Sequence, residues 1–270
     1  MQIVLTTGLS AFILYFVATG LLTWSLKRRQ GGEVRLIRLA LGAGFLAVLL
    51  HAYVLYALML TDVGIDLSVF RVASLLAWLA SALVLLAALR RPVENLGVGV
   101  FPLAALSLLA VGFSPAQSQP LQSASAGLEW HILLSLFAYS VLALAALQAV
   151  LLYIQNQHLH NKHPGGFIRA LPPLQTMESM LFQMIGLGFA LLSAALVSGF
   201  VALEDMFAQH LVHKTVLSIL AWIVFGILLW GRWQFGWRGR VAIRWALGGF
   251  LVLMVAYFGS KLVLELILAR

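Results

Sequence analysis

Two histidines, His131 and His213, stand at the start of two long apolar segments, and a third, His51, lies inside another. A neutral imidazole offers one nitrogen lone pair, which binds iron, zinc or copper. The sequence contains no cysteine, so thiolate metal sites and thiol redox chemistry are absent. Two imidazoles from different segments could therefore bind a metal ion or a haem iron from two sides.

The other four histidines fall into two groups. His210 precedes His213 by three residues, so the two share a helix face if the helix extends that far, and His210 is a reserve ligand. His158, His160 and His163 cluster in the polar segment NQHLHNKHPGG. A metal-binding tract is one interpretation of this cluster, but solvated loop histidines beside Lys162 are the interpretation that we favour.

The elements that must position these histidines are membrane helices. The chain is 62% hydrophobic and 10% charged over 270 residues, with a mean hydropathy of +1.00. Each crossing of the hydrocarbon needs about 20 apolar residues, so the chain has room for roughly eight crossings with short loops and no soluble catalytic domain. The net charge of +8 is typical of cytoplasmic loops in such a chain and does not indicate nucleic-acid binding.

Because lipid offers the backbone no hydrogen-bond partner, these crossings are expected to be helices. The predicted fold is an all-α, polytopic transmembrane bundle forming one integral membrane domain over residues 1–270. Pro102 is expected to interrupt the fourth span, and residues 114–127 are expected to form a flexible outer loop. The apolar segments cover residues 3–26, 36–60, 67–89, 96–113, 130–155, 179–203, 213–231 and 241–268.

Charge predicts the orientation of the bundle. The connections after the first, third, fifth and seventh segments hold thirteen of the seventeen Lys and Arg residues. By the positive-inside rule these connections are cytoplasmic, so both chain ends lie outside. His131 and His213 then both lie at the outer face, and His51 lies on the order of 14 Å below the outer end of its helix.

This placement favours a haem site. Imidazoles of His131 and His213 would be the axial ligands, while Trp and Phe side chains at the bundle mouth would cover the porphyrin. His51 is a further candidate, because hydrocarbon offers an ionisable group no partner; a neutral imidazole bonded to a neighbouring helix is the alternative. Arg71 is expected to pair with Asp62 or Asp66 rather than with a haem propionate. No Ser-His-Asp set, paired carboxylates or phosphate-binding loop is present, so we expect no enzyme.

The second half of the chain resembles the cytochrome c assembly proteins of the CcsA and CcmC type, and in particular the subgroup of YpjD- and HemX-type inner membrane proteins. Residues 129–265 carry the resemblance: His131 opens a helix and Tyr139 follows eight residues later, Gly-Trp-Arg-Gly spans residues 236–239, and Tyr-Phe-Gly spans residues 257–259. The resemblance implies a bacterial inner membrane protein that handles or delivers haem at the outer face. Membrane lipid and other cytochrome assembly or transport membrane proteins would be its partners.

The chain also departs from that family. An external tryptophan-rich motif ending in Trp-Asp-Pro-Lys is replaced by LEDMFAQHLVHK, and Trp230 stands where the family has a histidine. The resemblance thus supports His131 and His51 as haem ligands, whereas His213 is a replacement particular to this sequence. An accessory or transport-related membrane protein that kept the bundle but lost haem is the alternative function.

Overall fold

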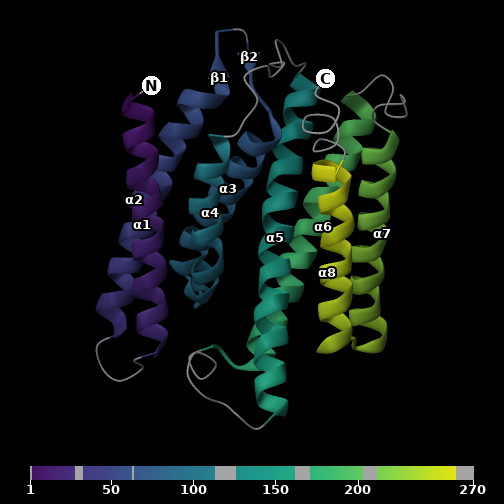
Figure 1. The fold of residues 1–270 in the computed structure, drawn as a ribbon. Helices are drawn as coiled ribbons and strands as arrows, with labels where there is room; N and C mark the ends of the chain where they lie inside the picture. Colours follow the sequence, from purple (N-terminus) through teal and green to yellow (C-terminus); the bar gives the residue numbers. More distant parts are fainter. Residues whose placement is uncertain are drawn as a thin grey trace. The chain divides into compact units, whose positions relative to one another are not determined.

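The computed structural model describes residues 2–27, 33–62, 64–112, 126–161, 171–202 and 212–259. In these ranges, eight helices are long and apolar enough to cross a membrane, which confirms the predicted all-α, polytopic fold (Figure 1). The helices are α1 (Gln2–Lys27), α2 (Glu33–Met59), α3 (Val69–Ala88), α4 (Gly97–Val111), α5 (Ala126–His160), α6 (Leu174–Ala202), α7 (Val212–Phe235) and α8 (Arg240–Met254). The placement of both chain ends outside stays a prediction.

Helix α5 is longer than its apolar segment predicts at both ends. It begins at Ala126 and ends at His160, so the predicted outer loop gives way to helix two residues early, and residues 113–125 lie outside the described part. The prediction that His158 and His160 are loop residues is wrong, because both lie in the last helical turn with exposed side chains. Hydropathy marks where a helix leaves the hydrocarbon, whereas backbone hydrogen bonds continue through polar residues.

Four short elements have no counterpart in the sequence-based prediction. Strands β1 (Leu60–Thr61) and β2 (Gly64–Ile65) pair as an antiparallel hairpin between α2 and α3. A 3-10 turn, η1 (Glu94–Leu96), leads into α4, which runs through Pro102 without interruption. A π-helical turn, η3 (Val255–Gly259), continues α8. Proline removes one backbone donor, and the packed surroundings of α4 keep the helix continuous despite that loss.

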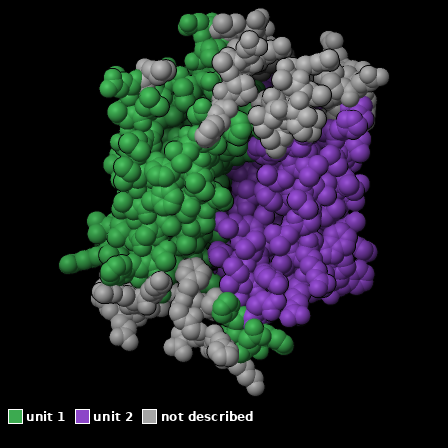
Figure 2. All heavy atoms as spheres, viewed as in Figure 1, with its two compact units in different colours: residues 1–122, 158–172 green, residues 123–157, 173–270 purple. Residues whose placement is uncertain are grey.

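The chain divides into two compact units, shown in different colours in Figure 2. Unit 1 comprises residues 1–122 and 158–172, and its core gathers side chains from α1, α2, α3 and α4. Tyr15 and Phe101 are fully buried there, surrounded by alanines that allow close helix contact. That the chain forms a single integral membrane domain stays a prediction.

Unit 2 comprises residues 123–157 and 173–270. On α6 the buried residues recur every three or four positions, as at Leu181 and Ile185, so this helix turns one face inward. On α5 the residues from Ser140 to Ala146 are buried on nearly every side of the helix. The two helices approach closely at Gly188, where an added Cβ would lie 2.6 Å from Leu142 side-chain atoms. This approach sets α6 directly against the helix that carries His131.

Candidate functional site

His131 lies in the second turn of α5 and is half-buried against α6. Its Nδ1 lies 2.8 Å from the backbone carbonyl oxygen of Ala195. A carbonyl oxygen only accepts hydrogen bonds, so Nδ1 carries the proton and donates it. The neutral ring then has its lone pair on Nε2, and this tautomer is assigned from the hydrogen-bond partner.

Ser198 completes the support of His131. Its hydroxyl donates to the same Ala195 oxygen at 2.9 Å and lies 3.5 Å from His131 Nδ1. Histidines that bind metals ordinarily donate their second ring N–H to a carbonyl or carboxylate, which orients the ring and makes the ligating nitrogen more basic. The surroundings of His131 therefore fit a ligand that binds iron through Nε2.

His213 is the second residue of α7, and its side chain is exposed. In the described part of the chain, no hydrogen bond engages its imidazole. Trp222 on α7 donates to Ser193 on α6 at 2.7 Å, which sets the relative level of the two helices. At a rise of 1.5 Å per residue from that contact, the backbone of His213 lies roughly 10 Å closer than the backbone of Ala195 to the end of unit 2 at which α6 ends and α7 begins. His131 and His213 thus share one end of unit 2 at different depths.

His51 lies on α2 in unit 1 and is completely buried. Its Nδ1 lies 3.2 Å from the Tyr15 hydroxyl on α1, and its Nε2 lies 2.8 Å from the Ser74 hydroxyl on α3. Ser107 on α4 donates to Ser74 at 3.3 Å, so the chain of contacts joins all four helices of the unit. Both ring nitrogens of His51 are engaged, which leaves no free lone pair for a ligand.

The other predicted site residue, His210, lies outside the described residues. In the ranges that the structure describes, no three His, Asp or Glu side chains come together as a metal-binding group.

Tyr139 connects the helix of His131 to the end of α8. Its hydroxyl donates to the Leu253 carbonyl oxygen at 2.5 Å, and its ring lies 6.0 Å from that of Tyr257 between centroids. Two of the sequence features that carried the family resemblance, Tyr139 and the Tyr-Phe-Gly run, therefore meet in space. π-Helical turns such as η3 are frequent at functional sites.

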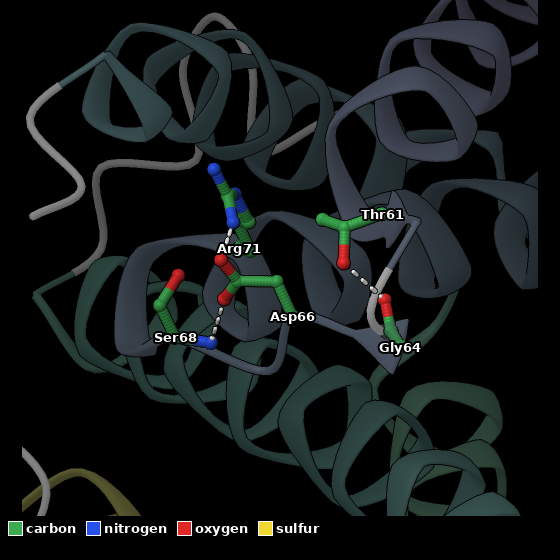
Figure 3. A network of polar contacts seen from close by, with 5 residues as sticks. All are labelled: Thr61, Gly64, Asp66, Ser68 and Arg71. Atoms are coloured by element: carbon green, nitrogen blue, oxygen red, sulfur yellow. Dashed lines mark hydrogen bonds and ion pairs between the residues drawn. The ribbon is translucent and has the colours of Figure 1, made fainter. Parts of the chain in front are cut away.

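Arg71 forms an ion pair with Asp66 at the end of unit 1, which confirms one of the two predicted partners (Figure 3). The buried Asp66 carboxylate also accepts a hydrogen bond from the Ser68 backbone N–H at 2.8 Å. Nearby, the Thr61 hydroxyl donates to the Gly64 carbonyl oxygen at 2.6 Å within the hairpin. The pair ties α3 to the segment that follows the hairpin.

Sequence reasoning missed the partners of His131. Ser198 is one of several small residues on α6, and the Ala195 carbonyl carries no side-chain signal at all. A serine one turn after a buried alanine on a neighbouring helix is too common a pattern to identify such a contact.

Comparison with known proteins places the chain among membrane proteins. A family model described as "Cytochrome C assembly protein" matches residues 39–268. The inner membrane protein YpjD of Escherichia coli strain K12 is 34% identical over 262 residues, covering 96% of this chain and 98% of that protein. The cytochrome c biogenesis protein CcsA of Chlamydomonas reinhardtii is 30% identical over 155 residues, covering 55% of this chain and 42% of its own length. No solved structure is significantly similar.

Proposed function

Because the chain belongs to the cytochrome C assembly protein family, we propose that it holds haem at one end of unit 2 and serves cytochrome c biogenesis. It is a multi-pass protein of the inner membrane, as its eight apolar helices and its likeness to an inner membrane protein indicate. His131 is the proposed axial ligand, through Nε2. The hydrogen bond from Nδ1 to the Ala195 carbonyl carries this proposal.

The bound haem would supply an iron that accepts nitrogen ligands and carries one electron. The protein's part is to hold the ring of His131 in one tautomer and one orientation, which Ala195 and Ser198 do together. Trp130, next to His131, is 63% exposed and offers an aromatic surface at the same end of the helix. An apolar ring of this kind would cover part of a porphyrin face.

The second ligand is proposed to be His213, with His210 in reserve. The imidazole of His213 is exposed, so it would ligate iron without giving up a hydrogen bond to any residue that the structure describes. His51 would have to release Tyr15 or Ser74 before it could bind iron. The role that we propose is haem handling or delivery at the outer face, without catalysis, in company with lipid and with other cytochrome assembly or transport membrane proteins.

A second candidate function is that of an accessory or transport-related membrane protein without haem. The observation in its favour is the segment LEDMFAQHLVHK, which lacks the tryptophans that the resemblance leads us to expect. Retention of a transporter on gentle purification, together with a protein that never takes up haem, would support this function.

An absorption spectrum of the full-length protein purified in detergent tests the haem proposal. We expect a Soret band, present on purification or formed after haem is added, and its loss in His131→Ala. His158→Ala is the matched control, because His158 is an exposed histidine in the last turn of the same helix. Failure of the wild-type protein to bind added haem, or an unchanged spectrum in His131→Ala, would contradict the proposal.

A further inference from the structure

The turn between α7 and α8 is fixed by contacts from three helices of unit 2. The Arg232 guanidinium donates to the Trp237 carbonyl oxygen at 3.2 Å and lies 4.7 Å from the centre of the Phe182 ring on α6. Glu178, also on α6, accepts a hydrogen bond from the Gly239 backbone N–H at 2.7 Å. The turn therefore has one defined conformation relative to all three helices.

Two glycines and one close contact shape this turn. Gly236 and Gly239 have φ angles of 65° and 57°, which glycine adopts without the penalty that other residues incur. The Trp237 indole lies so close to Gly231 that an added Cβ would be 2.4 Å from the ring. The indole also packs on Trp245 of α8, with 5.5 Å between ring centroids. The Gly-Trp-Arg-Gly run thus builds a rigid corner.

Three arginines project from this corner. Arg238, Arg240 and Arg244 are exposed, and we call them the basic turn. Arg240 and Arg244 are four residues apart on α8, so they lie on one helix face beside Arg238. No ion pair joins them to any residue that the structure describes. Glu178 is the one nearby carboxylate shown, and it is 7% exposed and turned toward the Gly239 N–H.

Aromatic side chains surround the basic turn. Trp233 is 81% exposed, and Trp230 and Phe235 are 54% and 61% exposed. Tryptophan is enriched where lipid headgroups meet hydrocarbon, so these rings indicate the depth of the turn in a membrane. A small soluble anion has no apolar part that could contact this exposed aromatic surface.

We propose that the basic turn binds the phosphate of an anionic phospholipid headgroup. Guanidinium groups form paired hydrogen bonds with phosphate oxygens. Trp233 and Phe235 would lie against the glycerol and upper acyl region of the same lipid. Because the corner is already rigid, little conformational entropy is lost when the lipid binds.

Native mass spectrometry of the full-length protein in neutral detergent, titrated with phosphatidylglycerol or with phosphatidylcholine, tests this proposal. We expect phosphatidylglycerol to bind preferentially. Substituting all three arginines (Arg238→Ala, Arg240→Ala, Arg244→Ala) is expected to weaken its binding by about a hundredfold, while phosphatidylcholine binding is unchanged. The corresponding triple lysine variant keeps the charge but loses the paired hydrogen bonds, so its affinity should lie between those of the wild type and the alanine variant.

The matched control is the triple variant Arg35→Ala, Arg38→Ala and Arg90→Ala, which removes three exposed arginines expected on the same membrane side. Its affinity for phosphatidylglycerol should stay within about twofold of wild type. An equal loss in this control, or displacement of the lipid by millimolar inorganic phosphate alone, would overturn the proposal. If the alanine variant fails to fold, Arg240→Gln with Arg244→Gln gives the same comparison with about a thirtyfold expected loss.

Discussion

His51 in unit 1 and His131 in unit 2 are both imidazoles carried by apolar helices, yet they differ in how their nitrogens are used. His51 is completely buried and both of its nitrogens contact hydroxyl groups. His131 is half-buried and uses one nitrogen on a carbonyl oxygen. His51 joins helices through two partners, whereas His131 keeps one ring nitrogen without a hydrogen bond to any described residue, as its proposed ligand role requires.

Depth in the membrane alone favours His51 as the ligand candidate, whereas the hydrogen bonds favour His131. An ionisable group far from the membrane surface is a functional candidate because hydrocarbon offers it no partner. In unit 1, however, Tyr15, Ser74 and Ser107 supply partners from three other helices. The proposed ligand role of His131 therefore rests on its unused ring nitrogen and not on its depth.

The largest effect is expected from Arg71→Met in unit 1. The substitution leaves the buried Asp66 carboxylate without its ion-pair partner, which should lower the free energy of unfolding by about 3 kcal/mol. Denaturant-induced unfolding in detergent measures this loss. The matched control Arg90→Met removes an exposed arginine and should change stability by less than about 0.5 kcal/mol. Loss of the Soret band at unchanged stability would instead assign Arg71 to haem binding.

His51→Leu should lower the free energy of unfolding by about 2 kcal/mol, because two buried hydroxyl groups lose a partner. The haem absorbance per folded molecule should remain that of the wild type. His213→Leu provides the contrast: its side chain is exposed, so stability should change little while the haem spectrum changes. If His51→Leu abolishes haem binding and leaves stability intact, the distinction between the two units is wrong.

Tyr139→Phe is expected to cost about 1 kcal/mol in unit 2, since it removes the donor to the Leu253 carbonyl oxygen. Thermal unfolding of the purified variant measures this change. Tyr153→Phe is the control on the same helix, because its hydroxyl is exposed and contacts Gln157 alone among the hydrogen bonds described for it. Equal destabilisation by both substitutions would show that the contact with α8 contributes nothing.

Ser198→Ala should have the smallest effect, about 0.5 kcal/mol, because the Ala195 carbonyl still accepts from His131. Nitrogen-15 NMR of labelled histidine should show Nδ1–H in both wild type and variant. Ser179→Ala, at the opposite end of α6, is the control. Appearance of the Nε2–H tautomer in Ser198→Ala would mean that the serine, rather than the carbonyl, fixes the ring.

The helices could be predicted because a membrane-crossing segment must be long, apolar and internally hydrogen-bonded. The pair of Arg71 with Asp66 could be predicted as well, since the two residues are close in sequence and opposite in charge. The contact between His131 and Ala195 could not, because the residues are 64 positions apart and the acceptor is a backbone atom. Glu178 was overlooked for a similar reason: its partner is the N–H of Gly239.

The π-helical turn and the hairpin were also beyond prediction. Residues 255–259 are as apolar as the helix before them, so no change of composition marks the wider turn. The hairpin pairs two strands of two residues each, which is too short for an alternating pattern to be recognised.

Helix α5 has a consequence for the reach of the protein beyond the lipid. Its 35 residues measure about 52 Å at 1.5 Å per residue, whereas the hydrocarbon layer is about 30 Å thick. Roughly 20 Å of continuous helix must therefore project from the hydrocarbon or be absorbed by tilt. Unless tilt absorbs all of this excess, the polar final turn of α5, with His158 and His160, lies beyond the hydrocarbon layer.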